Sequence, residues 1–227
     1  MKILGIDTAL GACSVALLDG DKIAGHAHEK MQRGHAEALA PMTESVMRKT
    51  KNSYSNLERL AVTTGPGTFT GQRGGIAFVR AMALALKIPA VGVTTLDALS
   101  EQALREEKAD WSLAVSDAKR GEVYLGARAS SGETLVAASI MTHEAAATLI
   151  EDKIESHGSN LVLSGTGAEI LQPIFESKGW DLQPAKVLQP DAIFVARLGA
   201  VMPMPKSPPK PLYLRAPDAK LPERPIP

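Results

Sequence analysis

The chain has 227 residues, of which 44% are hydrophobic and 22% charged, as is ordinary for a globular protein. Lys plus Arg and Asp plus Glu number 25 each, and this neutrality argues against a main role in gripping nucleic acid, since phosphate neutralisation supplies most of that affinity. The single cysteine, Cys13, excludes an internal disulfide and a cysteine-rich zinc site. With no signal peptide and no apolar run near the ~20 residues of a membrane span, we expect a soluble cytoplasmic protein.

The first half of the chain alternates predicted strands and helices. Residues 2–8 and 13–29 read as strands, and the second stretch is divided by hairpin turn residues at Asp19-Gly20-Asp21. Residues 35–50 read as a helix that Pro41 should kink or begin. A strand over 57–64, a glycine loop, a helix over 76–87, a strand over 90–95 and a helix over 96–107 follow, the last opened by a Thr94–Asp97 capping box.

The second half repeats this order of elements. Residues 112–129 form a strand, an Asp, a basic glycine turn and a returning strand, and residues 160–177 form a strand, a glycine loop and a helix. Asp117 therefore matches Asp7. Such a repeat favours a duplicated α/β architecture with a central cleft. We divide the chain into an N-terminal lobe at 1–106, a smaller C-terminal lobe at 107–202 and a proline-rich tail at 203–227.

The tail differs in kind, because nine of its 25 residues are proline and exclude regular helix or central strand. Residues 211–217, "PLYLRAP", are apolar enough to dock on the body. Residues 218–227 are expected to form a mobile end.

The stretch "GPGTFTGQRGG" at 65–75 lies where a strand turns into a helix, a common position for a bound phosphate. Its glycines fit neither the Walker spacing nor G-x-G-x-x-G. Thr68, Thr70 and Gly71 remain weak candidates for an anion site. The structural alternative is that Thr68 or Thr70 caps the helix, while Gly67, Gly71 and Gly75, spaced by four, let another backbone approach closely.

Other polar residues form no clear catalytic set. Asp7 could hold a metal–phosphate at the end of the first strand, or could close a turn through nearby N–H groups. The five histidines match no metal-ligand spacing, and Cys13 is expected to be a buried small side chain. Lys119 and Arg120 at a hairpin tip could meet phosphate or an acidic partner, or form a solvated turn.

Six segments resemble the bacterial TsaB family and run in order through nearly the whole chain. They are "MKILGIDTALGACSVALLDG", "RGHAEALAP", "GPGTFTGQRGGIAFVRAMALAL", "VGVTTLDALS", "DAKRGEVY" and "PLYLR". The resemblance implies the two-lobed actin-like and sugar-kinase (ASKHA, ribonuclease H-like) fold. It also implies a non-catalytic scaffold subunit, without a cofactor or metal, for N6-threonylcarbamoyladenosine modification of tRNA beside the anticodon.

The resemblance further implies partners. The transferring paralogue, TsaD, carries a metal on a His-x-x-x-His helix, and matching the segments puts Thr95 and Leu99 at the two histidine positions. TsaD would pair with this chain through helices of the N-terminal lobe, TsaE would join the assembly, and a homodimer would form when TsaD is absent. Contact with tRNA is expected only within the complex.

Apolar helix faces of the N-terminal lobe are the candidates for this partner interface, with intramolecular core as the alternative. The candidates are Leu39, Met42, Val46, Ile76, Val79, Arg80 and Ala83. Two positions depart from the family pattern, since Gln72 and Gly74 stand where branched apolar residues are usual. The same fold is also compatible with two other functions. One is an ATP-dependent phosphotransferase, which would need paired Asp-Gly phosphate hairpins, and the other is an M22-like peptidase, which would need metal ligands.

Overall fold

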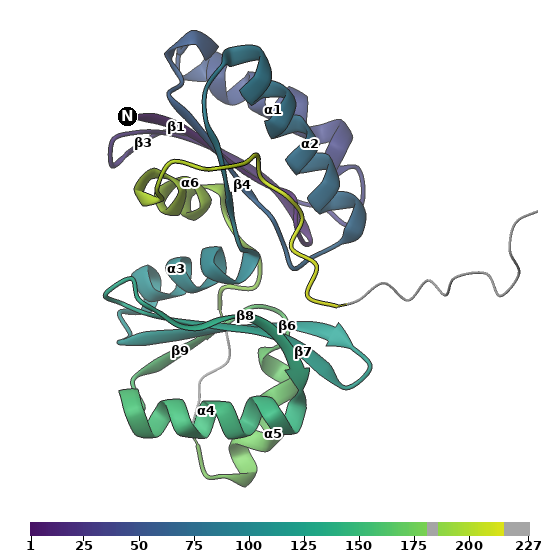
Figure 1. The fold of residues 1–227 in the computed structure, drawn as a ribbon, viewed down its shortest axis with the longest axis vertical. Coiled ribbons are helices and arrows are strands. Elements are labelled where there is room, and N and C mark those ends of the chain that lie inside the picture. Colours follow the sequence, from purple (N-terminus) through teal and green to yellow (C-terminus); the bar gives the residue numbers. More distant parts are fainter. Residues whose placement is uncertain (181–185, 216–227) are drawn as a thin grey trace, which may run out of the picture.

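The computed structural model describes residues 1–180 and 186–215 as two mixed sheets, each covered by helices on both faces (Figure 1). The first sheet has the order β3-β2-β1-β4-β5 and the second β8-β7-β6-β9. Each sheet contains an antiparallel hairpin, formed by β1 and β2 in the first and by β6 and β7 in the second. The first strand of each hairpin also pairs in parallel with a later strand, β1 with β4 and β6 with β9. The predicted α/β duplication is confirmed.

The strands are β1 Lys2–Asp7, β2 Ala12–Asp19, β3 Lys22–Lys30, β4 Arg59–Thr63, β5 Ala90–Val93, β6 Trp111–Lys119, β7 Glu122–Ala129, β8 Thr134–Thr142 and β9 Leu161–Ser164. The helices are α1 His35–Lys49, α2 Phe69–Leu86, α3 Thr95–Glu107, α4 His143–His157, α5 Ala168–Ser177 and α6 Ala192–Val201, with a 3-10 turn at Tyr54–Asn56. Because α1 begins at His35, Pro41 lies inside it and does not mark its start.

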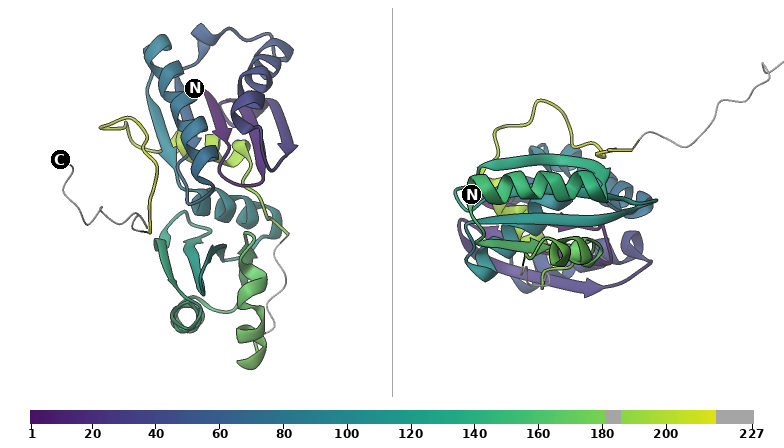
Figure 2. Two further views of the ribbon diagram at one scale, coloured as in Figure 1. Left: turned by 90° about the vertical axis from the view of Figure 1, so that its right-hand side faces the viewer. Right: turned by 90° about the horizontal axis from the view of Figure 1, so that it is seen from below.

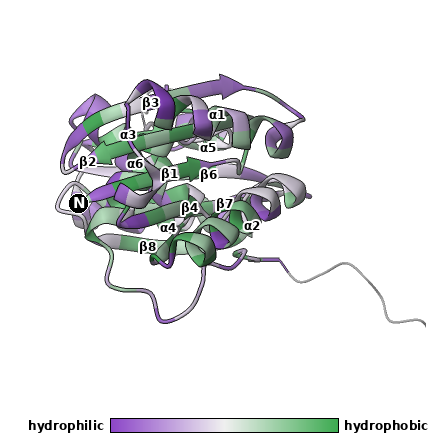
Figure 3. Cartoon of the chain, turned by 90° about the horizontal axis from the view of Figure 1, so that it is seen from above, coloured by the Kyte–Doolittle hydropathy of each residue, from purple (hydrophilic) through white to green (hydrophobic). Residues whose placement is uncertain are grey.

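Side chains of the first sheet alternate between two cores, as the period of a strand requires. Leu4 and Ile6 face α1 and α2, whereas Ile3 faces α6. Gly5 also lies on the α6 side, where a Cβ atom would meet the Ala192 carbonyl oxygen at 2.3 Å. Close approach of α6 therefore depends on the missing side chain. The outer strand β3 is largely hydrophilic (Figure 3) and mostly exposed.

The second sheet repeats this layering. Trp111, Leu113 and Val115 face α4 and α5 on one side, and Ala114 packs with α3 residues on the other. Since α3 and α6 also contact each other, the two helices form the middle layers between the sheets, as Figures 1 and 2 show.

The structure divides the lobes differently from the sequence-based boundaries. Helix α3 was assigned to the first lobe yet packs on β6, β7 and β9 of the second sheet. Helix α6 was assigned to the second lobe yet packs on β1, β2 and β4 of the first. Each helix crosses over because its apolar face complements the sheet of the other lobe, which the local pattern of residues does not reveal.

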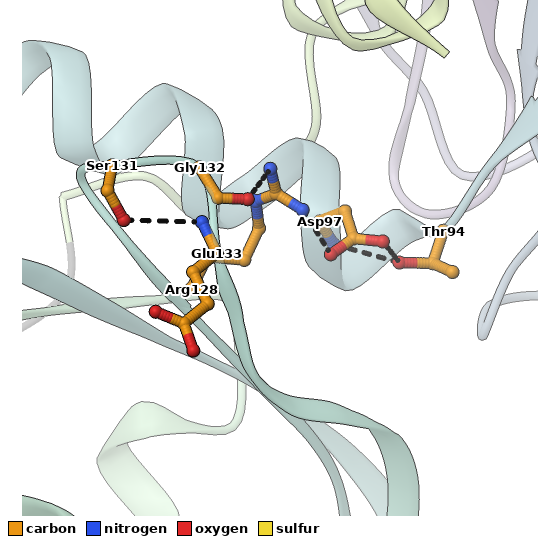
Figure 4. Close-up of polar contacts among 6 residues, drawn as sticks. All are labelled: Thr94, Asp97, Arg128, Ser131, Gly132 and Glu133. Atoms are coloured by element: carbon orange, nitrogen blue, oxygen red, sulfur yellow. Dashed lines mark hydrogen bonds and ion pairs between the residues drawn. The ribbon is translucent and has the colours of Figure 1, made fainter. Parts of the chain in front are cut away.

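A polar cluster ties α3 to the second sheet (Figure 4). Thr94 caps α3 as predicted, since its hydroxyl accepts a hydrogen bond from the Asp97 N–H at 2.9 Å. The Asp97 carboxylate accepts from that hydroxyl at 2.6 Å, whereas in a full capping box it would accept from the Thr94 backbone N–H. Arg128 of β7 contacts the same carboxylate at 3.3 Å and donates to the Gly132 carbonyl. The cap of α3 is thereby linked to the β7–β8 hairpin.

Residues 203–215, here called the strap, leave α6 and run beside the first sheet toward the second (Figure 2). The Leu212 N–H donates to the Thr64 carbonyl at 2.8 Å, and Arg215 donates to the Ala118 carbonyl at 2.8 Å and pairs with Glu122. The strap thus contacts both lobes. Residues 216–227, which include the whole of the expected mobile end at 218–227, lie outside the described residues. Within the described ranges, no helix has the length and apolar character to cross a bilayer.

Candidate functional site

The glycine loop begins helix α2 seven residues earlier than predicted. Thr68 is the N-cap, its hydroxyl accepting from the Gly71 N–H at 3.3 Å, so the helix starts at Phe69. Helix α2 therefore contains Gly71, Gly74 and Gly75, although each lowers intrinsic helix propensity by about 1 kcal/mol relative to Ala. Tertiary packing explains why the helix tolerates them.

Three glycines spaced by four face the turn between β1 and β2. A Cβ atom on Gly67 would meet the Ala9 carbonyl oxygen at 2.3 Å, one on Gly71 the Thr8 carbonyl oxygen at 2.1 Å, and one on Gly75 the Thr8 hydroxyl at 2.3 Å. The turn is also hydrogen-bonded to the loop, since the Thr68 N–H donates to Ala9 and the Thr8 hydroxyl donates to Gly71. The spacing serves close backbone packing.

This packing leaves little at the loop for an anion. The Gly71 N–H is used by Thr68, the Gln72 N–H bonds the Thr68 carbonyl, and carbonyl oxygens of the β1–β2 turn lie against the glycines. Thr68 and Thr70 are exposed, whereas Gly71 is buried. Carbonyl oxygens repel a phosphate, so the geometry favours the structural interpretation over an anion site at Thr68, Thr70 and Gly71.

We expect Gly71→Ala to destabilise the fold by about 1–3 kcal/mol, because its Cβ would overlap a backbone oxygen that cannot rotate away. Gly74→Ala is the matched control, since its Cβ would lie at an ordinary 3.6 Å from the Ala36 Cβ, and it should stabilise α2 by about 0.5–1 kcal/mol. Urea unfolding of both variants measures the difference. Equal loss of stability in the two would contradict the close-packing argument.

Asp7 lies at the carboxyl end of β1 and is completely buried. One carboxylate oxygen accepts from the Thr63 hydroxyl at 2.7 Å and from the Ala9 N–H at 3.1 Å, while the other has no hydrogen-bond partner among the described residues. Burial raises the pKa of Asp7 to about 7, and the nearby Asp191 carboxylate adds to this, against the hydrogen bonds that lower it. Asp7 therefore closes a turn, and in this arrangement it is not presented to a ligand.

Residues just before α6 close the same region, and the sequence patterns did not single them out. The Gln189 side chain accepts from the Gly11 N–H of the β1–β2 turn at 2.7 Å. Asp191 caps α6 and lies 3.0 Å from His26. Burial alone would raise the pKa of Asp191, but hydrogen bonds from His26 and the Ile193 N–H hold this pKa below its usual value. Gly11 and Gln189 are 178 positions apart and only folding brings them together, so no local signal could have revealed the cluster.

Thr95 and Leu99, matched by resemblance to a metal-binding pair, are both buried one turn apart on α3. Leu99 packs in the apolar core with Leu96 and Ala103, and the Thr95 hydroxyl has no partner within the described part of the chain. A leucine side chain offers no donor atom, and a neutral hydroxyl is a poor ligand for a transition metal. These residues do not fit a catalytic metal.

The remaining candidates are dispersed. His26 and His28 lie on β3, and the His35 ring contacts the Leu10 carbonyl at 2.9 Å. Cys13 is buried, as predicted, and burial raises the pKa of its thiol to about 12, which makes it a poor nucleophile. Over residues 1–180 and 186–215, no group of three or more His, Cys, Asp or Glu side chains is arranged to hold a metal.

Four of the candidate interface residues are in the core beneath the first sheet's helices: Leu39, Val46, Ile76 and Val79. Their side chains are therefore unavailable to a partner unless the core opens. Met42 and Ala83 are partly buried against the same core, and Arg80 is exposed. The helical period that selected these residues marks the buried face of a helix as readily as a partner face.

The outer face of α2 carries a different set of residues. Apart from Thr70, the exposed positions of α2 are apolar or basic and recur at helical spacing, and the helix contains no acidic residue. They include Phe69, Arg73, Ala77, Arg80, Ala81 and Leu84. We call this set the α2 stripe. Its end at Leu84, which is 82% exposed, borders a cavity of about 580 Å³ between α2 and the strap. Because the predicted helix began at residue 76, the stripe could not be recognised at its full length.

Comparison with known families places the chain close to tRNA-modification proteins. Residues 21–197 match the model of the TsaD family, described as tRNA N6-adenosine threonylcarbamoyltransferase. The chain is similar to the tRNA threonylcarbamoyladenosine biosynthesis protein TsaB of Escherichia coli, with 31% identity over 85% of this chain and 83% of the relative. The chain is also similar to TsaB of Buchnera aphidicola subsp. Schizaphis graminum, with 30% identity over 84% of this chain and 89% of the relative.

Solved structures agree with these relatives. YeaZ from Pseudomonas aeruginosa superposes with a TM-score of 0.70 at 28% identity, covering 88% of this chain and 90% of that one. An uncharacterised protein with similarity to peptidase YeaZ, also from Pseudomonas aeruginosa, gives 0.78 at 28% identity over 94% and 99%. A ROK hexokinase from Thermus thermophilus, with a TM-score of 0.51 at 15% identity over 88% and 99%, shares only the fold, and that fold is the one expected of an actin-like, sugar-kinase architecture.

Proposed function

Since the chain belongs to the TsaB family, we propose that it takes part in forming N6-threonylcarbamoyladenosine on tRNA as a non-catalytic subunit. In this role it binds TsaD and supports its activity. The related proteins are named for the biosynthesis of this modified nucleoside. TsaE would join the assembly, and tRNA would be held mainly by the complex.

The observation that carries the non-catalytic role is the pair Thr95 and Leu99. Both are buried on α3 and neither supplies the imidazole that a catalytic metal would need there. Two further features agree with it. Asp7 is buried under hydrogen bonds from its own turn, and Gln189 occupies the backbone N–H of Gly11. A chain whose own side chains occupy the polar groups of the β1–β2 turn is suited to a structural role.

The α2 stripe is the surface we propose for TsaD. Among the original candidates, Arg80 retains an exposed side chain and Met42 and Ala83 retain part of theirs. The stripe adds Ala77, Ala81 and Leu84, whose small or apolar side chains permit close helix–helix packing. In the absence of TsaD, two copies could use the same face as a homodimer, since a two-fold interface needs only one self-complementary patch.

We expect tRNA modification by the assembled subunits to be lost when this chain is omitted. The measurement is a threonylcarbamoylation assay with each subunit left out in turn. Unchanged activity without the chain would contradict the supporting role, and turnover by the chain alone would contradict the non-catalytic one.

We expect Leu84→Glu to weaken co-purification with TsaD by at least tenfold without loss of folding, because it places a charge within an apolar contact. Glu44→Gln is the control, being a mild change at an exposed position on α1. Full retention of TsaD by the Leu84→Glu protein would exclude the α2 stripe as the interface.

A further inference from the structure

Two exposed aromatic rings and an arginine meet where α2 begins. The Arg73 guanidinium lies 3.6 Å from the centroid of the Phe69 ring, and its Nε donates to the Tyr213 hydroxyl at 2.8 Å. Phe69 is 61% exposed and Tyr213 is 54% exposed, although large aromatic side chains usually bury most of their area. The strap therefore brings Tyr213 from the end of the chain to a ring on α2 that is 144 residues away in sequence.

A small cavity opens between these rings. Its volume is about 100 Å³, and its lining includes Phe69, Tyr213, Tyr124 of β7 and the side chains of Gln72 and Arg215. Gln72 is 3% exposed, and its amide oxygen has no hydrogen-bond partner among the described residues. We call this cavity with its aromatic rim the aromatic notch. The aromatic rings can stack on the face of a flat heterocycle, while the Gln72 amide and the Arg215 guanidinium can hydrogen-bond to its edge.

The charges around the notch are those of an anion-tolerant surface. Arg73 has no carboxylate partner among the described residues, and α2 has no acidic residue. Glu122 pairs with Arg215 and Asp117 pairs with Lys119. The Lys119–Asp117 pair is exposed, and exposed ion pairs are weak enough for a phosphate to replace the carboxylate.

The basic hairpin at Lys119–Arg120 lies next to the notch. Arg215, which lines the cavity, donates to the Ala118 carbonyl at the same hairpin. Lys119 and Arg120 both adopt left-handed backbone, with φ of 63° and 61°, a conformation that costs energy for residues other than glycine. Arg215 also donates to the Lys119 carbonyl at 3.4 Å, and the side chain of Lys119 is 79% exposed.

From this arrangement we propose that the aromatic notch binds one unstacked base of single-stranded RNA, with the hairpin cations beside the adjoining phosphates. Proteins that bind single strands combine aromatic stacking platforms with basic grooves, because every base has a π-face and every nucleotide a phosphate. A duplex cannot use the notch, since its bases are already stacked. The inference deepens the proposed function by giving this subunit a contact with its RNA substrate.

Phe69 and Arg73 belong both to the aromatic notch and to the N-terminal end of the α2 stripe, so the contact proposed for TsaD is the remaining part of the stripe, from Ala77 to Leu84. Phe69 and Arg73 lie at the end of α2 that touches the second lobe's hairpin through the strap, while Leu84 lies four turns away. A partner protein could also use exposed aromatic and arginine side chains. That occupant is one of the outcomes of the test below.

The test titrates the full chain into a fluorescein-labelled, unstructured 12-mer RNA and, separately, into the same strand paired with its complement. The protein concentration rises to roughly 0.3 mM at about 20 mM salt, because non-specific complexes have dissociation constants of about 10⁻⁴–10⁻⁶ M. Fluorescence anisotropy is expected to show tighter binding of the single strand than of the duplex. Phe69→Ala and Tyr213→Ala should each weaken single-strand binding by about 5- to 100-fold, the range for a lost base stack, and remove that preference.

Two control variants separate stacking from general effects. Tyr213→Phe keeps the ring and should keep single-strand affinity within about threefold, while Tyr54→Ala removes an exposed ring elsewhere and should change nothing. Equal binding of single strand and duplex by the unmodified chain would overturn the proposal. So would unchanged RNA binding of Phe69→Ala with loss of TsaD co-purification, which would make the notch a protein contact.

These outcomes are separate from those for the proposed function. A chain required for tRNA modification whose single-strand binding is insensitive to Phe69 and Tyr213 retains the proposed function and loses the notch. A chain that binds single-stranded RNA through the notch but is dispensable for tRNA modification would support the notch and contradict the proposed function.

Discussion

Replacing Val79 by Glu is expected to unfold the protein. Val79 is fully buried on α2 against the first sheet, among Leu39, Val46 and Ile76. Burial raises the pKa of a carboxyl group in such a site by about four units, so the group is protonated at pH 7, which costs about 3.7 kcal/mol (about 2.7 pKa units at 1.36 kcal/mol each). Burying this carboxyl without a hydrogen-bond partner adds about 1–3 kcal/mol. Because whole domains are stable by only about 5–15 kcal/mol, most of the native state should be lost. Circular dichroism and urea unfolding measure this.

Leu84→Glu is the matched control, since it introduces the same side chain on the same helix at a position that is 82% exposed. Its effect on the free energy of unfolding should stay within about 0.5 kcal/mol, as for most surface changes. A folded Val79→Glu protein that had only lost its partner would contradict the packing described above. It would return Val79 to the interface.

Replacing Asp7 by Asn is expected to flatten the dependence of stability on pH. The pKa of Asp7 is about 7 in the folded protein, against an ordinary value of 3.8, so the unfolded chain releases this proton first as pH rises. Its effect is absent below about pH 4. Between there and pH 7 the unmodified protein loses about 4 kcal/mol, at 1.36 kcal/mol per pKa unit, and the loss persists above pH 7.

An Asn side chain keeps the acceptor for Thr63 and Ala9 but cannot ionise, so the variant should gain stability over the unmodified protein as pH rises. Urea unfolding at pH 4 to 8 measures the two slopes. Asp191→Asn should act in the opposite direction, because the pKa of Asp191 is lowered and its carboxylate stabilises the fold at neutral pH. Parallel pH profiles for Asp7→Asn and the unmodified protein would rule out this role for Asp7.

Local patterns predicted the elements well, because each depends on residues near one another in sequence. The Asp19–Asp21 turn forms the β2–β3 hairpin, Thr94 and Asp97 form the expected cap, and the duplicated order of strands is present in both sheets. The glycine spacing at 67, 71 and 75 also predicted close backbone approach, which the structure shows to be against Thr8 and Ala9. In each case a backbone constraint appears directly in the residue type.

The sequence was a poorer guide to which partner each helix face contacts. Leu39, Val46, Ile76 and Val79 have the spacing of a helical stripe, and such a stripe looks the same whether it meets a sheet or another protein. The start of α2 was predicted too late because glycine and threonine have low helix propensity. The Thr68 cap and the packing of the β1–β2 turn outweigh that preference.

The secondary-structure order, the duplicated α/β fold and the resemblance to TsaB proteins can be recognised in the sequence, and the resemblance implies that Thr95 and Leu99 stand where TsaD has histidines. These follow from periodicity, turn chemistry and residue identity, which are local properties. Only the tertiary structure decided that α3 and α6 each cover the other lobe's sheet, that Asp7 is buried beside Asp191, and that Tyr213 joins Phe69 and Arg73. Apart from those of α3, these contacts join residues about 100 or more positions apart. Their formation depends on the free energy of packing the whole chain, which no short pattern encodes.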